Sequence, residues 1–88
     1  MNKFVIVYDD DTIRAATENI ISKMYDLADC DYMDNVRDIY SVDESGKLVP
    51  VEVGTQHRES YDAGGIYYAS APIKAGKRTV GFVHYSDH

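Results

Sequence analysis

Residues 3–8 read KFVIVY and residues 9–11 read DDD, and this abrupt change fixes the first element of the fold. The run of β-branched and aromatic residues carries no charge after Lys3, which predicts a β-strand. Apolar and polar residues do not alternate along it, so we expect a central strand that is covered on both faces. The aspartates end this strand, and Asp10 or Asp11 is predicted to cap the element that follows.

An amphipathic helix is predicted over residues 11–28, a segment without glycine or proline. Its apolar residues recur at helical spacing and form one stripe expected to face the core. The residues of this stripe are Ile13, Ala16, Ile20, Met24 and Leu27. Arg14 and Glu18 lie on the other side, four residues apart, where we expect a surface ion pair. Residues 29–35 are rich in Asp and Asn and are predicted to form a loop.

Two β-hairpins are predicted after this loop. Residues 36–42 and 47–53 are extended runs joined by a short polar turn that ends in Gly46, which is a hairpin pattern. Residues 65–71 and 78–85 form the second pair of extended runs, with a glycine in the turn between them.

Pro50, Gly81 and residues 54–64 give further predictions about these strands and the loop between the hairpins. Pro50 has no N–H to donate, so its strand is predicted to lie at a sheet edge, or Pro50 faces outward at a bulge. Gly81 in the last strand predicts a bulge or a close approach by another backbone. Residues 54–64 are polar and are predicted to form a long loop.

The resulting order of elements is β-α-β-β-β-β, in a single small domain spanning residues 1–88. This order is typical of an α+β fold, a mostly antiparallel β-sheet with one amphipathic helix packed on one face. One helix covers one face only, so the other face is expected to stay apolar and open. Its candidate side chains are Val5, Val7, Tyr67 and Phe82. We therefore expect a homodimer, paired through that face or through the edge near residues 65–71 and 78–85.

Acidic residues are concentrated in the first half of the chain. The whole chain carries a net charge of −6, but the segment from Asp9 to Glu44 holds eleven acidic and three basic residues, a net charge of −8. The last 44 residues hold four acidic and five basic residues. This asymmetry argues against direct binding of nucleic acid, and it favours a basic surface of another protein as the partner.

The sequence contains no nucleophile elbow, phosphate-binding glycine loop or dinucleotide fingerprint, so we expect a non-enzymatic protein without a cofactor. No metal site is predicted either. Asp29, Asp31 and Asp34 begin like a calcium loop, but the glycine and glutamate that such a loop requires are missing. His84 and His88 have the spacing of a zinc pair, but they do not share a helix face.

Cys30 is the only cysteine, which rules out an intramolecular disulfide and favours a reducing compartment. The apolar run near residue 3 is too short for a signal peptide, and no run approaches the roughly 20 residues that cross a bilayer. We therefore expect a cytoplasmic protein that makes no membrane contact.

The leading hypothesis is a protein-binding inhibitor or adaptor that docks an acidic face on a basic partner. The predicted partner-binding residues are Asp10, Asp11, Asp26, Asp29, Asp31, Asp34 and Asp38. In size and charge the chain is similar to small acidic, virus-encoded inhibitors that occupy the nucleic-acid-binding groove of a host protein. That likeness implies a viral inhibitor of a host nucleic-acid-binding protein.

The alternative hypothesis is an oligomeric protein that binds or sequesters a small anionic, nucleotide-like molecule. Tyrosines would line a pocket, and a basic side chain would meet the anionic group. The candidate ligand-binding residues are His57, Arg58, Tyr61, Tyr67, Tyr68, Lys77 and Arg78.

Overall fold

The computed structural model describes residues 3–28, 31–54, 57–61 and 67–86 of the chain. These residues form one helix and seven antiparallel strands, which confirms the α+β class. In chain order the elements are β1 (Phe4–Tyr8), β2 (Ile13–Ala16), α1 (Glu18–Asp26), β3 (Val36–Val42), β4 (Leu48–Val53), β5 (His57–Tyr61), β6 (Tyr67–Ala75) and β7 (Arg78–Ser86). The predicted order β-α-β-β-β-β is confirmed only in part, because β2 and β5 are additional strands in segments predicted as helix and loop.

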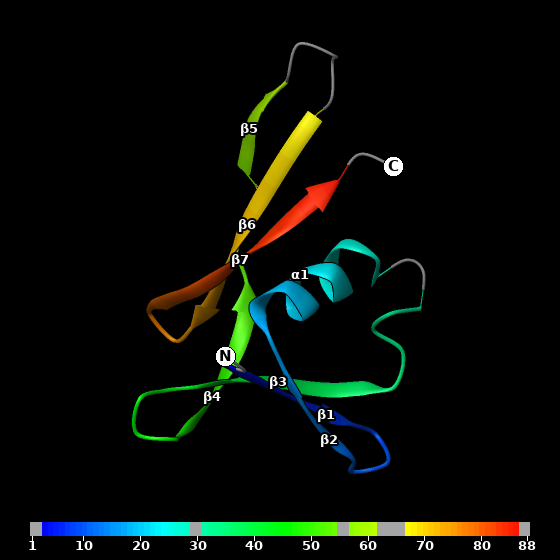
Figure 1. The fold of residues 1–88 in the computed structure, drawn as a ribbon, viewed down its shortest axis with the longest axis vertical. Coiled ribbons are helices and arrows are strands. Elements are labelled where there is room, and N and C mark those ends of the chain that lie inside the picture. The colour runs from blue at the N-terminus through cyan, green and yellow to red at the C-terminus, as the bar shows by residue number, and fades with distance from the viewer. Residues whose placement is uncertain (1–2, 29–30, 55–56, 62–66, 87–88) are drawn as a thin grey trace.

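Strand β4 connects two sheets because it changes partner halfway along its length. Leu48–Pro50 pairs with β3, and Val51–Val53 pairs with β6. We call β2, β1, β3 and the first half of β4 the N-terminal sheet, and the second half of β4 with β5, β6 and β7 the C-terminal sheet. Figure 1 shows the C-terminal sheet rising from the N-terminal sheet, with α1 in the angle between them.

Pro50 lies where β4 changes partner, and its side chain is exposed. The prediction of an edge strand is wrong, because β4 has β3 and β6 as neighbours. The alternative, an outward-facing proline at a bulge, is correct for the exposed side chain, but the pairing of β3 with β4 shows no shift of register at Pro50. A residue without an N–H is tolerated at this changeover because the ladder to one partner ends there and the ladder to the next begins.

The helix begins at Glu18, seven residues later than predicted at residue 11, because Ile13–Ala16 pairs with β1 as a strand. Its N-cap is Thr17, whose hydroxyl oxygen accepts from the backbone N–H of Ile20 at 3.3 Å. The predicted cap at Asp10 or Asp11 is therefore wrong. Asp10 Oδ1 accepts a hydrogen bond from the backbone N–H of Thr12, two residues later in the chain. Such a local bond from a side chain to the backbone favours a turn over a helix.

The core lies between α1 and the facing sides of both sheets. Its buried residues are Phe4, Ile6, Ala16, Ile21, Met24, Ile39, Ile73 and Val83. The predicted stripe is correct for Ala16 and Met24, but Ile13 is 70 % exposed on β2. Ile21 is fully buried and was absent from the stripe. The predicted stripe treats residues 13–27 as one continuous helix, whereas Ile13–Ala16 is strand β2 and the helix begins at Glu18.

The predicted ion pair of Arg14 with Glu18 is also wrong, because it requires both residues to lie on one helix.

The second hairpin has longer strands than predicted, since β6 and β7 approach each other to a two-residue turn of Gly76 and Lys77. Gly76 has φ +63°, a conformation that glycine adopts without strain. Residues 65–66 of the predicted strand lie outside the described part of the chain. Part of the predicted loop 54–64 is strand β5, which follows β4 along the same side of β6.

Helix α1 runs beside the free edge of β7. The backbone N–H of Phe82 donates to Glu18 Oε2 at 3.4 Å, and the N–H of His84 donates to Ser22 Oγ at 2.9 Å. Glu18 and Ser22 are four residues apart on the helix, a rise of about 6 Å, and Phe82 and His84 are two residues apart on the strand, a rise of about 6.6 Å. The spacing of the acceptors along α1 therefore matches the spacing of the donors along β7. The helix therefore covers strand N–H groups that would otherwise be open to pairing.

Gly81 leaves room for the Glu18 side chain, because a Cβ at position 81 would lie 2.8 Å from the Glu18 Cδ. The predicted close approach by another backbone is therefore wrong, because the neighbour is a side chain. A bulge is also present, since Ile73 pairs with Gly81 while Lys74 pairs with Thr79.

Replacing Gly81 with alanine is expected to lower the free energy of unfolding by about 1 kcal/mol, because the new Cβ forces Glu18 away from the Phe82 N–H. Urea denaturation followed by circular dichroism measures this change. In a Glu18→Ala background the same substitution should cost clearly less, since no side chain then has to move. An equal cost in both backgrounds would contradict this explanation.

Candidate functional site

Two acidic segments that lie far apart in the sequence meet at one corner of the N-terminal sheet. The Asp9 N–H donates to the Asn35 carbonyl at 2.8 Å, which holds the β1–β2 turn beside the turn at residues 31–35. Both turns lie at the lower right of Figure 1. We call the resulting cluster the acidic end, and its exposed members are Asp9, Asp10, Asp11, Asp34 and Asp38.

Arg37 is the basic residue that pairs within the acidic end. Its Nη2 lies 2.7 Å from Asp11 Oδ1, and its Nε lies 4.0 Å from Asp38 Oδ2. The hydrogen bond to Asp11 raises the pKa of Arg37, and the charges of Asp11, Asp38 and Asp9 raise it further. All these groups are solvent-exposed, so the pairs contribute little stability. One guanidinium against five carboxylates leaves a local net charge of −4.

Local hydrogen bonds shape the β1–β2 turn. Asp10 Oδ1 accepts from the Thr12 N–H at 3.0 Å and from the Thr12 hydroxyl at 2.6 Å. Asp11 and Asn35 have φ of 68° and 64°, left-handed conformations that Asp and Asn tolerate. The cluster is therefore held by its backbone, which leaves the carboxylates of Asp9 and Asp34 directed to solvent without a hydrogen bond from a described residue.

The pKa of Asp10 is lowered by its hydrogen bonds to the Thr12 hydroxyl and backbone. A lowered pKa in the folded state means that this group stabilises the fold above its unfolded pKa of about 4, and that the contribution is lost as pH falls through the folded value. Replacing Thr12 with valine is expected to raise the Asp10 pKa toward the ordinary value. Carboxyl titration by NMR measures this shift.

Asp43 provides the matched control for this titration. Its pKa is lowered by a hydrogen bond from the Ser45 hydroxyl and by backbone bonds in the β3–β4 turn, where Asp43 Oδ1 accepts from the Ser45 hydroxyl at 2.7 Å. Because that turn does not contain Thr12, the Asp43 pKa should not change. A shift at Asp43 equal to that at Asp10 would indicate a global effect and contradict the local one.

The predicted partner-binding residues are only partly brought together. Asp10, Asp11, Asp34 and Asp38 belong to the acidic end, and Asp31 lies exposed at the start of the same turn as Asp34. Asp26 lies elsewhere, on α1 beside Tyr85, whose pKa is raised by burial and then by the charge of Asp26. Asp29 lies outside the described residues.

Sequence reasoning missed Asp9 and Arg37 as members of the acidic end. The sequence pattern places Asp9 at the end of a strand and Arg37 within the next one, and it does not show that the two residues lie close together. A hairpin interpretation of residues 4–16 would have identified Asp9, because it turns the aspartates into the tip of a hairpin.

The candidate ligand-binding residues of the alternative hypothesis are distributed along the C-terminal sheet. Lys77 and Arg78 lie at the β6–β7 turn, whereas Tyr67 and Tyr61 pair at the opposite end of β6. His57 and Arg58 pair with the middle of β6, and Tyr68 pairs near Tyr67. The side chains of residues 57–61 and 67–68 are outside the described part of the structure. The backbone thus separates the basic pair from the tyrosines.

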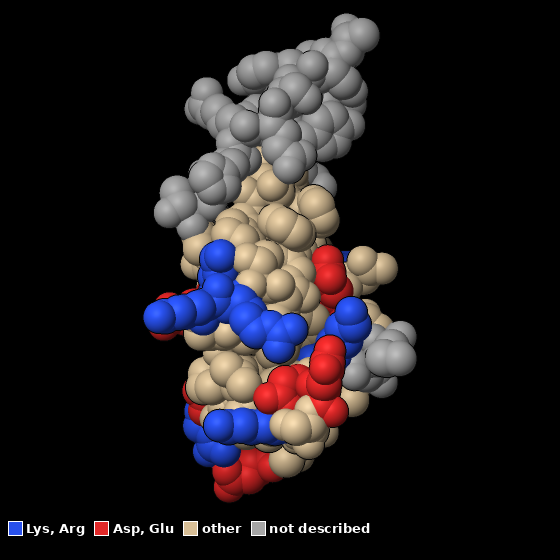
Figure 2. Space-filling view, turned by 90° about the vertical axis from the view of Figure 1, so that its left-hand side faces the viewer, with Lys and Arg blue, Asp and Glu red and all other residues tan. Residues whose placement is uncertain are grey.

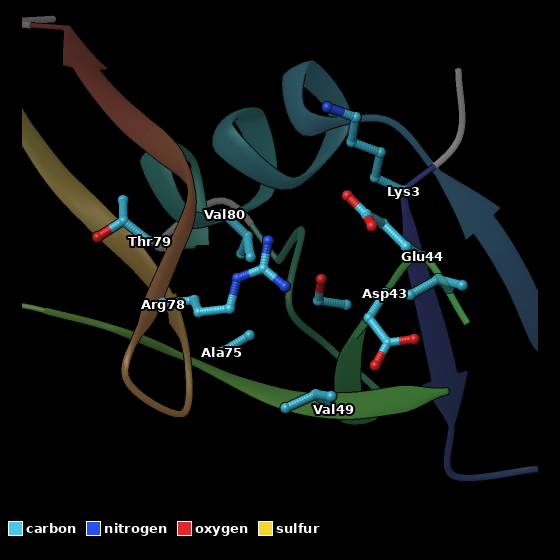
Figure 3. A pocket seen from close by; sticks show the side chains of 10 residues that line it. Lys3, Asp43, Glu44, Val49, Ala75, Arg78, Thr79 and Val80 are labelled. Carbon is cyan, nitrogen blue, oxygen red and sulfur yellow. The ribbon is translucent and has the colours of Figure 1, made fainter. Parts of the chain in front are cut away.

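A groove of about 610 Å³ lies between the β3–β4 turn and the β6–β7 turn. Figure 3 shows Arg78 reaching into it from β7, with Asp43, Glu44 and Lys3 on the opposite wall. The buried Ser41 also lines it. Figure 2 views the molecule from the side toward which the β6–β7 turn points, and Lys and Arg side chains gather across the middle of that side. The groove therefore has mixed charge and one available guanidinium.

Within residues 3–28, 31–54, 57–61 and 67–86, no group of three or more His, Cys, Asp and Glu side chains is arranged to hold a metal ion. The same residues include no helix that is long and apolar enough to cross a membrane. Comparison with known proteins finds no matching family model, curated protein or solved structure.

Proposed function

We propose that the chain is a non-enzymatic binding protein, an inhibitor or adaptor whose acidic end docks on a basic surface of another protein. One observation carries this proposal: the Asp9–Asn35 hydrogen bond joins two separate acidic segments into a single exposed cluster. A concentrated negative charge of this kind steers a basic partner and speeds its association. The basic β6–β7 turn lies away from it, on the left-hand side of Figure 1.

The test is affinity capture from cell extract with the immobilised chain, followed by elution with a salt gradient. Asp34→Asn with Asp38→Asn removes two charges from the acidic end, and neither side chain holds a turn. Glu44→Gln with Glu52→Gln removes two charges elsewhere and is the matched control, because both variants have a net charge two units less negative than that of the wild type. The first pair is expected to weaken association with a captured partner at least about tenfold, and the second pair to leave it nearly unchanged.

Equal losses in the two variants would mean that capture reflects net charge alone, which would contradict a defined site. Binding that is indifferent to salt would contradict electrostatic docking altogether.

A second candidate function is the binding of a small anionic molecule in the groove between the β3–β4 and β6–β7 turns. It is favoured by Arg78, which lines this groove and forms no ion pair with a described residue. Native mass spectrometry of the purified chain is expected to show a retained ligand that Arg78→Gln loses. A ligand-free mass spectrum, or retention by the variant, would contradict this function.

A further inference from the structure

The strand register sorts the side chains of the N-terminal sheet into two faces. Directly opposed residues of antiparallel strands point to the same face. One face holds the buried Phe4, Ile6 and Ile39, which contact the core beneath α1. We call the opposite side the outer face. The register assigns to it Val5, Val7, Ile13, Ala15, Asp38, Tyr40, Val42, Leu48 and Pro50.

Eight of these nine residues are apolar, and none of the nine belongs to the core. Ile13 is 70 % exposed and Leu48 is 46 % exposed, while Ala15 and Pro50 are also exposed. Figure 1 shows α1 and the C-terminal sheet on the other side of β1 and β3. The N-terminal sheet is thus apolar on both faces, and Val5 and Val7 lie on its outer face as predicted. The prediction is wrong for Phe82, which lies on β7 in the C-terminal sheet, and the side chain of Tyr67 is outside the described part of the structure. The largest continuous apolar patch on a protein surface is often a binding site.

The outer face is continuous with the acidic end. Val7 pairs with Asp38 across the strands, and it also pairs with Ile13 on its other side. Ile13 follows Thr12, the last residue of the turn that carries Asp9, Asp10 and Asp11. Apolar contact area and negative charge therefore form one surface, with the charge gathered at one end.

The area of the outer face and the charge at its end together indicate which kind of partner binds there. Four strands about 4.8 Å apart and four residues long span on the order of 250–300 Å², well below the roughly 800 Å² that each partner buries in a standard interface. A second copy of this chain, with its net charge of −6, would meet an apolar face edged by like charge. A basic partner gains contact with both the apolar face and the acidic end.

We propose that the outer face and the acidic end together bind a basic amphipathic helix of another protein. Its apolar stripe packs on Val5, Ile13, Tyr40 and Leu48, and its Lys or Arg residues lie over Asp34 and Asp38. A helix about 10 Å in diameter fits on a sheet of this width. This inference rests on the proposed docking function and names its partner class.

The test measures binding of a defined probe by isothermal titration calorimetry and fluorescence anisotropy. The probe is a helical peptide of leucine and lysine, about four turns long, with leucine on one face. A second peptide keeps every lysine and carries serine in place of leucine. Light scattering of the chain alone records its oligomeric state.

Ile13→Ser with Leu48→Ser removes exposed apolar groups from the outer face, so the variant is expected to fold. It should weaken binding of the leucine–lysine peptide at least about tenfold. Phe82→Ser is the matched control, because Phe82 is 45 % exposed, much like Leu48, but lies on β7. It should leave binding unchanged, and the serine–lysine peptide should bind far more weakly.

Three outcomes would overturn the inference. In the first, both peptides bind equally and the variant Ile13→Ser with Leu48→Ser has no effect on binding. This result would be compatible with docking by charge but would contradict an apolar binding site. A dimer that dissociates on Ile13→Ser with Leu48→Ser would place a second copy on the face. Peptide binding that depends on the outer face but ignores Asp34→Asn with Asp38→Asn would overturn the proposed function as well, because the occupant would not need to be basic.

Discussion

Replacing Phe4 with alanine is expected to lower the free energy of unfolding by about 3–5 kcal/mol. Phe4 is fully buried on β1, between Ala16 of β2 and Ser41 of β3, and it is among the largest side chains of the core. A domain of 88 residues has a total stability of roughly 4–13 kcal/mol, so this loss is a large part of it. Urea denaturation followed by circular dichroism gives the change.

Ile13→Ala is the control for this measurement. Ile13 is 70 % exposed on β2, so its truncation should cost about 0.5 kcal/mol or less. If residues 11–28 were one helix with Ile13 in its buried stripe, the same truncation would cost about 2–5 kcal/mol. A large loss at Ile13 together with a small loss at Phe4 would contradict the observed arrangement of β1 and β2.

The strands that the sequence predicts well are those with local signals. The run FVIVY, the hairpin around Gly46 and the hairpin around Gly76 each combine β-branched or aromatic residues with a turn residue. Both glycines have positive φ in the structure, which explains why the turns fall there. These elements depend on contacts close in sequence, and such contacts can be recognised in a single chain.

The helix boundary was not predictable in the same way. Ile13 and Ala16 fit a helical stripe by spacing, yet they lie on an edge strand that forms only because β1 is beside it. Asp11 at φ 68° makes the reversal tight enough for that pairing. Helix periodicity is a weak guide over four residues, and a neighbouring strand overrides it.

The acidic end illustrates the same limit for the candidate site. Its acidic composition is evident from the sequence, and the docking hypothesis rests on that composition. Its assembly depends on one backbone hydrogen bond between Asp9 and Asn35, which are 26 positions apart. No periodicity or motif reports a contact of that kind. For the same reason Asp26 was grouped with the cluster, although it faces Tyr85.

The second large effect is expected at the edge of β7, where α1 takes the place of a neighbouring strand. Replacing Glu18 and Ser22 with alanine removes the acceptors of the Phe82 and His84 N–H groups. The double variant should lose about 1–3 kcal/mol of unfolding free energy, because it removes two hydrogen bonds that each contribute about 0.5–1.5 kcal/mol. An open strand edge also pairs readily with other chains. We therefore expect concentration-dependent association by light scattering, together with the loss of stability by urea denaturation.

Asn19→Ala serves as the control, because Asn19 is exposed on the same helix and its replacement tests the effect of alanine on helix propensity alone. Alanine favours a helix at each of these positions, so helix propensity acts against the expected destabilisation. A net loss of stability in the double variant must therefore come from the edge of β7.

The single variant Ser22→Ala should show most of the effect, since the bond to Ser22 at 2.9 Å is shorter than the bond to Glu18 at 3.4 Å. If the double variant is as stable and as monodisperse as Asn19→Ala, then α1 covers β7 by apolar packing alone. Ile21 and Met24 would in that case hold the helix in place, and Gly81 would be needed only to make room for Glu18.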